Sequence, residues 1–250
     1  MCVPTPVAAF RDREDAHAGR PGRARRTKPH AMCANYQAVT AADRLLHHFG
    51  VSRPRDELPP EVYPGGLAPF VVRAAHRVEI ARELQAGLFG LLPFWAKDLA
   101  FGRRTYNARS ETVDEKPSFR DAWRQGRRCI VPVEAVYEPN WESGRAVRWR
   151  VARRDGAPMG LAGLWGRWRG PDGREWLSFT MLTVNADGHA VFGRLHRPGE
   201  EKRMVAILDE SEFDRWLDGD EAQARALLRP YPADRLVAEP APRLPAGPRR

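Results

Sequence analysis

The chain has 250 residues, of which 42% are hydrophobic and 29% charged, and this balance predicts a single globular domain with a polar surface. No apolar run approaches the roughly 20 residues that span a bilayer, and the first residues lack the apolar stretch of a secretory signal peptide, so we expect a cytoplasmic protein with no membrane partner. The three cysteines include no CxxC pair, which favours neither a disulfide framework nor a zinc site.

The formal net charge of +9 is compatible with a polyanionic partner such as nucleic acid. Residues 1–31 hold seven basic and three acidic side chains, so they carry +4 of this charge, and the other 219 residues carry +5. Basicity therefore persists without this segment, but charge alone does not decide for nucleic acid.

The first 31 residues are rich in Ala, Gly, Pro and Arg and lack the periodicity of a helix or strand. They cannot bury enough surface to order themselves, so we expect a disordered extension that is either a removed propeptide or sequence upstream of the true start. The first predicted element is a helix that Thr40 caps, that buries Leu45 and Phe49, and that ends at Gly50.

Seven later segments are predicted as strands, because they are rich in apolar and β-branched residues and are bounded by Gly, Asp or Pro. They span residues 69–74, 84–92, 129–133, 147–152, 159–165, 176–184 and 203–208. A loop is expected over 59–69. Between the second and third strands, Ser118 is expected to cap a short helix in which Phe119 and Trp123 share a face.

Two amphipathic helices are predicted at 210–217 and 221–228, followed by a disordered tail over 238–250 that holds four prolines. The domain itself is therefore expected over residues 32–237. Many consecutive strands with helices at the flanks predict an α+β fold, in which a single domain has a largely antiparallel, barrel-like β-sheet flanked by short helices.

The sequence contains no GxGxxG, Walker-type loop, HExxH or GxSxG motif, so the common signatures of nucleotide, metal and hydrolase sites are absent. We expect a function that uses neither a metal ion nor an organic cofactor. Cys129 lies inside an apolar strand and is expected to be inert.

Four short segments are better candidates for chemistry. They are 32–36 (MCANY), 106–111 (YNARSE), 128–139 (RCIVPVEAVYEP) and 196–204 (HRPGEEKRM). In this order and spacing they resemble the SOS response-associated peptidase (SRAP) family from Met32 to about Leu208. The likeness continues more loosely through Pro64-Gly65 and through 93–96 (PFWA).

The resemblance implies the SRAP fold and a role in the response to DNA damage. In that family the cysteine after the initiator methionine becomes N-terminal and bonds covalently to abasic sites in single-stranded DNA. Cys33 would take this role after loss of Met32, because only an N-terminal cysteine combines a thiol with a free α-amine, whose ordinary pKa is about 7.7–8.0. The amine can form a Schiff base with the sugar aldehyde, and the thiol can then close a thiazolidine intramolecularly. The active form would therefore begin at Cys33.

The resemblance also assigns catalytic roles to three other residues. Glu138 is expected to be a general acid/base, and His196 is expected to protonate the sugar oxygen as the ring opens. Asn107 is expected to hydrogen-bond near the cysteine.

Three residues are expected to contact DNA. Arg109 would hold a phosphate with its planar guanidinium, and Trp95 would stack on a base. Asn35 lies where many members of the family have an arginine, so one phosphate-binding arginine is missing there. Pro139 replaces a common tryptophan, and the segment 198–202 separates the histidine from the Arg-Met pair, which indicates a subfamily with a longer loop.

Taken singly, the same residues have structural explanations. Cys33 could be a small buried hydrophobe, and Glu138 a solvated carboxylate at a strand end. Arg109 could pair with Glu111, and Trp95 could pack in the core.

Three functions remain open at this point. The first is a monomeric, lyase-like protein that crosslinks to abasic sites in single-stranded DNA and associates with the nucleoid when bound. The second is a cysteine peptidase that uses Cys33 and His196 with Asn107 or Glu138, acting once on its own Met32–Cys33 bond. The third is a non-catalytic basic module that binds single-stranded nucleic acid.

Overall fold

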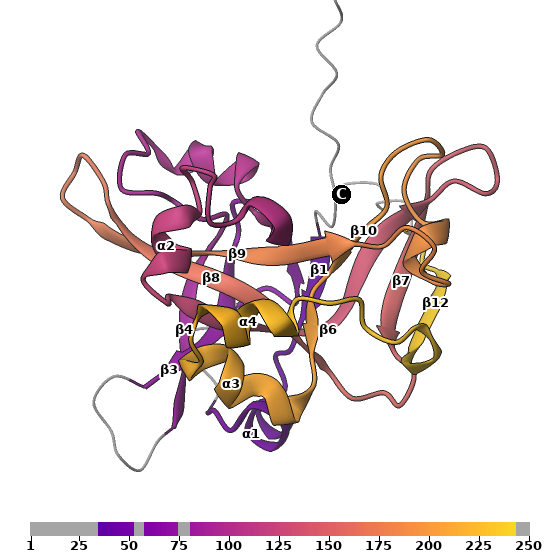
Figure 1. Cartoon of the computed structure of the whole chain (residues 1–250), viewed down its shortest axis with the longest axis horizontal. Helices are drawn as coiled ribbons and strands as arrows, with labels where there is room; N and C mark the ends of the chain where they lie inside the picture. Colours follow the sequence, from indigo (N-terminus) through magenta and orange to yellow (C-terminus); the bar gives the residue numbers. More distant parts are fainter. Residues whose placement is uncertain (1–34, 53–57, 75–80, 244–250) are drawn as a thin grey trace, which may run out of the picture. The chain divides into compact units, whose positions relative to one another are not determined.

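The computed structural model describes residues 35–52, 58–74 and 81–243, which belong to one compact unit of the chain (Figure 1). The strands are β1 (Asn35–Ala38), β2 (Glu61–Val62), β3 (Leu67–Arg73), β4 (Arg82–Phe89), β5 (Asn107–Arg109), β6 (Arg128–Asn140), β7 (Val147–Arg153), β8 (Met159–Arg169), β9 (Glu175–Asn185), β10 (Arg203–Val205), β11 (Ile207–Leu208) and β12 (Leu236–Pro240). The α-helices are α1 (Ala42–Phe49), α2 (Arg120–Arg124), α3 (Phe213–Asp218) and α4 (Glu221–Leu227). Across these ranges, no helix is long and apolar enough to cross a membrane.

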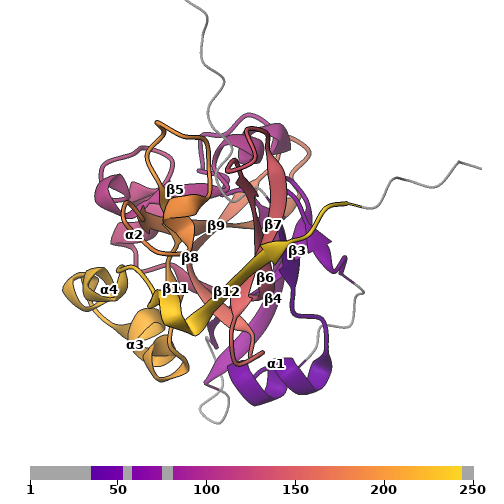
Figure 2. The same ribbon diagram turned by 90° about the vertical axis from the view of Figure 1, so that its right-hand side faces the viewer.

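Five strands close into a barrel (Figures 1 and 2). In the order β6–β8–β9–β4–β3 each strand pairs with the next, and β3 returns to β6 through Val71 and Ile130. All of these pairs are antiparallel except β4–β9. The predicted α+β fold with a largely antiparallel, barrel-like sheet is therefore confirmed.

Buried aromatic rings form much of the core. Phe179 packs against Phe70 and Phe89, with ring centroids 5.2 and 5.5 Å apart, and all three side chains are fully buried. Trp216 of α3 donates from Nε1 to the Cys129 carbonyl at 2.8 Å, which fixes this helix against β6. Burial raises the pKa of the Cys129 thiol well above its ordinary value, so Cys129 is unreactive, as the sequence predicts.

Strand β6 belongs to two parts of the sheet. Its first half, Arg128 to Val133, pairs with β8 inside the barrel, and its second half, Val136 to Asn140, pairs with β7. Along its other edge the second half pairs with β1, where Asn35 lies opposite Tyr137. The outer end of β6 is thus held between β1 and β7, away from the barrel closure.

The strands β1, β2, β5 and β12 were not predicted, and the loop predicted over 59–69 holds β2 and the start of β3. The elements that were predicted differ from the observed ones mainly at their ends. The first helix is confirmed and ends at Gly50, whose φ of +68° is a backbone conformation that glycine adopts without strain. Ala41 rather than Thr40 is its N-cap, and it makes no side-chain cap bond. The short helix α2 follows Phe119, so Ser118 does not cap it. The predicted strand at 129–133 continues to 140, and that at 203–208 divides into β10 and β11.

The C-terminal boundary of the domain was predicted too early. Residues 238–240 belong to β12, which pairs along its whole length with β7, so the predicted tail is wrong for them. Pro240 is tolerated because it is the last residue of a strand with a single partner, where a missing N–H costs little. Leu236, at the start of this strand, is fully buried.

We expect Leu236→Ala to lower the free energy of unfolding by about 2–5 kcal/mol, because it removes buried methyl groups from the core. Leu46→Ala is the matched control, since Leu46 is 62% exposed on α1. Denaturant unfolding of both variants measures the effect. Equal losses for the two leucines would contradict the assignment of β12 to the domain.

Candidate active site

The two residues predicted as acid/base groups form a buried pair. Glu138 lies near the end of β6, and His196 follows the 3-10 turn Phe192–Arg194. His196 Nε2 and Glu138 Oε2 are 3.0 Å apart, and the two side chains are only 6% and 1% exposed. The alternative of a solvated carboxylate at a strand end is therefore wrong for Glu138.

The protonation of His196 depends on its neighbour. Burial by itself would lower the pKa of His196, but attraction and hydrogen bonding to the Glu138 carboxylate outweigh it, and the pKa is raised from its ordinary value. The pair therefore favours an imidazolium that has a proton to donate, next to a carboxylate that can accept one.

The backbone at His196 is strained. Its φ is +64°, and no other non-glycine residue in the described part of the chain has a positive φ. The His196 N–H donates to the Pro139 carbonyl at 2.7 Å, which ties the loop to the end of β6. Lys202 Nζ donates to the carbonyls of Leu195, His196 and Arg197 at 2.8–3.1 Å. These bonds stabilise the conformation that directs the imidazole toward Glu138.

The segment around Arg109 forms an ion-pair network with the same loop. Asn107 and Arg109 lie on β5, which runs parallel to β9. Arg109 Nη1 lies 2.7 Å from Glu201 Oε2, so its partner is Glu201 and not the alternative, Glu111. Glu201 and Glu111 both bind the buried Arg203, at 2.9 and 2.8 Å. Burial would raise the pKa of each carboxyl, but the adjacent guanidinium groups lower both.

A hollow of about 320 Å³ opens beside Glu138. Its lining residues come from β1, β6, β7, the residue before β7 and the chain after β12. They are Asn35, Tyr137, Glu138, Pro139, Ala146, Arg148 and Arg243. The structure thus brings Asn35 and Glu138 to one cavity. Cys33, the predicted nucleophile, lies outside the described residues.

Trp95 lies in a different part of the structure. Its ring packs edge-to-face on Phe101, with centroids 5.0 Å apart, and it is 42% exposed, so the alternative of a core tryptophan is wrong. Among the described residues no hydrogen bond or ring contact ties Trp95 to the Glu138–His196 pair.

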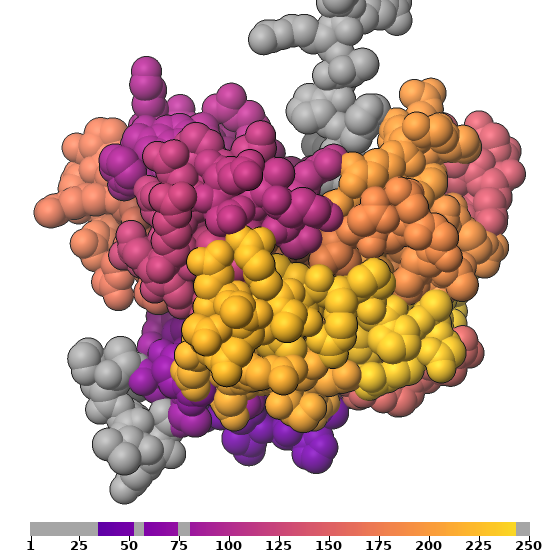
Figure 3. Space-filling model, viewed as in Figure 1, coloured from indigo at the N-terminus to yellow at the C-terminus, as the bar shows by residue number. Residues whose placement is uncertain are grey.

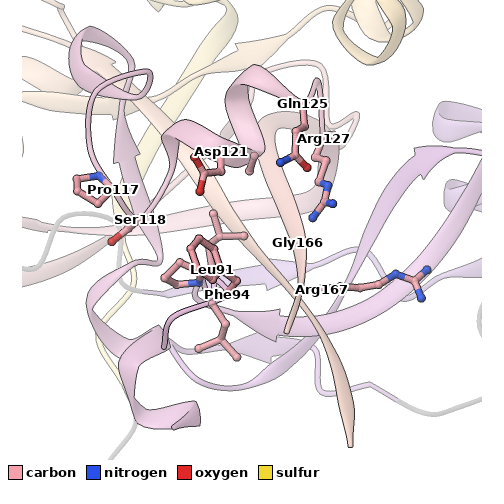
Figure 4. A pocket seen from close by; sticks show the side chains of 12 residues that line it. Leu91, Phe94, Pro117, Ser118, Asp121, Gln125, Arg127, Gly166 and Arg167 are labelled. Atoms are coloured by element: carbon pink, nitrogen blue, oxygen red, sulfur yellow. The ribbon is translucent and has the colours of Figure 1, made fainter. Parts of the chain in front are cut away.

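A second hollow of about 340 Å³ lies between the segment after β4, helix α2 and strand β8 (Figure 4). Figure 4 shows Asp121 of α2 and Gln125, the residue after this helix, above Phe94, with Arg127 near Gly166. None of the predicted site residues that the structure describes lines it. Nor does the described part of the chain hold a group of three His, Cys, Asp or Glu side chains placed to bind a metal ion.

Comparison with known proteins shows to which family this chain belongs. The model of the family described as SOS response associated peptidase (SRAP) matches residues 32–244. The chain belongs to the SRAP family.

Named relatives of this SRAP chain come from bacteria and animals. Abasic site processing protein YoqW of Bacillus subtilis is 27% identical over 215 residues, which cover 83% of this chain and 91% of YoqW. Abasic site processing protein HMCES of Rattus norvegicus is 28% identical over 187 residues, which cover 61% of this chain and 50% of HMCES. A crystal structure of a Bordetella bronchiseptica protein is 41% identical, with a TM-score of 0.78, and the likeness covers 84% of this chain and 99% of that one.

The structure of this SRAP chain adds site residues that the sequence did not suggest. Arg148 and Arg243 line the hollow beside Glu138, and Glu61 binds both Asn35 and Arg148. The alternation of side chains along β7 could have placed Arg148 on one face of the sheet. No sequence pattern, however, indicates Glu61 as its partner, because the two residues are 87 positions apart. Glu201, which holds Arg109, lies in the segment 198–202 between His196 and Arg203.

The pair between His196 and Glu138 predicts a pH-dependent stability. A raised pKa in the folded state means that the contribution of His196 is complete below its unfolded value of about 6.5, and that it is lost as pH rises through the folded value. The free energy of unfolding of wild type minus that of His196→Gln should therefore be larger at pH 6 than at pH 9, as measured by denaturant titration. In a Glu138→Gln background the pH dependence should shrink, and its persistence there would assign it to another group.

Proposed function

We propose that this protein acts on abasic sites in single-stranded DNA, and that Cys33, once it is the N-terminal residue, forms a thiazolidine with the abasic sugar. Membership of the SRAP family and the names of YoqW and HMCES support an abasic-site function. The buried Glu138–His196 pair beside the start of β1 is the single observation that most supports the chemistry.

Covalent geometry supports the place of Cys33 in this reaction. Asn35 lines the hollow beside Glu138, and Cys33 precedes it by two residues. Consecutive Cα atoms are about 3.8 Å apart, so the Cα of Cys33 cannot be farther than about 7.6 Å from that of Asn35. This limit supports the proposal that Cys33 reacts beside the hollow that Asn35 and Glu138 line.

The proposed reaction joins one amine, one thiol and one aldehyde and releases one water. The imidazolium of His196 protonates the sugar ring oxygen, the proton of the anomeric hydroxyl passes to Glu138, and the ring opens to the aldehyde. The α-amine of Cys33 attacks the aldehyde carbon, and loss of water gives the imine. The thiol sulfur then bonds to the imine carbon while its proton passes to the nitrogen, with Glu138 as the carrier, and this closes the five-membered ring.

The reaction requires a free α-amine, so residues 1–32 must be removed or never translated. We infer that the extension is not part of the active protein. Glu138, His196 and Asn107 serve as acid/base and orienting groups around Cys33, while Arg109, Trp95 and Asn35 contact the DNA strand.

The decisive experiment incubates the chain beginning at Met32 with single-stranded DNA that contains one abasic site. We expect an adduct that survives denaturing electrophoresis, none with Cys33→Ala, and undiminished adduct with Cys129→Ala, the matched thiol control. Glu138→Gln should slow adduct formation by about 100-fold or more, because positioned acid/base groups contribute about 10²–10⁴-fold. No adduct from the wild type, or an adduct from Cys33→Ala, would refute the proposal.

The same preparation separates the rival functions. An autopeptidase would release residues 1–32 from the 250-residue chain, and Cys33→Ala would block that release, as intact mass would report. A simple binder would form no adduct, and its affinity would fall steeply with salt.

The Arg109–Glu201 pair predicts a variant with stronger DNA binding. A phosphate must compete with the Glu201 carboxylate for Arg109, and an exposed ion pair of this kind contributes about 0.2–1 kcal/mol. Glu201→Gln should therefore lower the Kd for single-stranded DNA by up to about fivefold at low salt. Glu175→Gln makes the same change in net charge at the other end of β9, and equal binding by the two variants would exclude competition at Arg109.

A further inference from the structure

The carboxylate of Glu61 joins three segments of the chain at one point. Its Oε1 accepts hydrogen bonds from Asn35 Nδ2 at 2.6 Å, from the Tyr63 hydroxyl at 2.5 Å, and from Arg148 Nη2. Asn35 lies on β1, Tyr63 directly follows β2, and Arg148 lies on β7. Glu61 also lies opposite Gln37 in the β1–β2 ladder, so backbone and side chain both tie β2 to β1.

Arg148 is itself held firmly. Its guanidinium carbon lies 3.3 Å from the centre of the Tyr137 ring, and Tyr137 is the ladder partner of Asn35. Arg148 Nη1 donates to the Ala241 carbonyl at 3.2 Å, and the Ala241 N–H donates to the Arg148 carbonyl at 2.9 Å. Strand β12 lies beside β7 (Figure 2), and the residue that follows it, Ala241, supports Arg148 through these two bonds. Glu61 thus receives a donor whose position is fixed from two sides.

This arrangement fixes Asn35 more tightly than the strand ladder alone would. Strand ends open locally at little cost in free energy unless side chains tie them down. The Asn35 side chain is buried, with 7% exposure, and its amide donates to an acceptor that is ionised, which makes the bond stronger than one between neutral groups.

We propose that Glu61 is a positioning residue for the proposed reaction, because it holds Asn35, and with it the start of β1, beside Glu138. The inference rests on the proposed function. Glu61 touches no reacting atom in this scheme. It limits the positions that the Cys33 amine and thiol can take, and intramolecular reactions depend steeply on such limits, with misplacement by about 1 Å costing on the order of 100-fold.

The test compares Glu61→Ala with Glu134→Ala in chains that begin at Met32. Glu134 is the matched control, because it also lies on a strand of this sheet and binds an arginine, Arg44, through two bonds of 2.8 Å without contacting Asn35. We expect Glu61→Ala to lower the maximal rate of adduct formation at least tenfold, with the half-saturating DNA concentration unchanged within twofold. Glu134→Ala should leave both unchanged at a similar loss of melting temperature.

Two further variants separate positioning from general destabilisation. Glu61→Gln keeps an oxygen that can accept from Asn35 and should recover most of the lost rate. In maximal rate, Asn35→Ala should be as slow as Glu61→Ala, and the double variant no slower than either, since the two residues set this rate through one contact. Asn35→Ala alone should also raise the half-saturating DNA concentration, because Asn35 is the one of the two that is proposed to contact DNA. A Glu61→Ala rate equal to that of Glu134→Ala, or losses that multiply in the double variant, would overturn the proposal.

Hydrogen exchange distinguishes a failure of this inference from a failure of the proposed function. If the wild type forms no adduct, the function fails, and the positioning claim is judged by exchange in peptides that contain Asn35–Ala38. Faster exchange there in Glu61→Ala but not in Glu134→Ala supports it. Equal exchange in the two variants overturns it.

Discussion

The buried ion pair between Glu138 and His196 is the constraint around which the site is organised. Burying a charged group away from water costs free energy unless a group of opposite charge lies beside it. Loss of one partner would therefore leave the other as a buried charge that the protein cannot solvate. The pair joins a barrel-derived strand to a loop whose backbone is strained at His196. Lys202 stabilises that loop through its carbonyls, although its own charge opposes the imidazolium. The loop is therefore held at His196 from two sides, by the contact of the imidazole with Glu138 and by the bonds from Lys202 to the backbone carbonyls.

Strand β6 connects fold and site. Its inner half closes the barrel against β8, where packing leaves little freedom, and its outer half carries Tyr137 and Glu138 between β1 and β7. A rigid element that is anchored in the core and extends beyond it can hold a reactive group more precisely than a loop can. The partner from β1 needs separate support because β1 is short, and Glu61 supplies it.

The central strands could be predicted from the sequence because they are long and rich in apolar residues. The short strands could not, because they have too few residues to show a pattern. β8 and β9 have 11 residues each, and most of these are buried. β1, β2, β5 and β12 have two to five residues each, and their pairing with neighbouring strands holds them in place. Glu138 and His196 were identified through motifs, but their contact, across 58 residues, has no local signal. Glu61 and Arg148 lay outside every motif, because ion pairs between distant strands leave no periodicity in the sequence.

The position of β12 has a practical consequence for handling the protein. Arg243 lines the hollow together with Asn35, so both the first and the last described segments adjoin the same cavity. An affinity tag or fluorescent protein attached directly after Arg243 would start at the rim of this hollow and would obstruct a DNA strand bound there. The turn between β8 and β9, around Gly173, lies at the opposite end of β9 from β10 and is the safer place for a label.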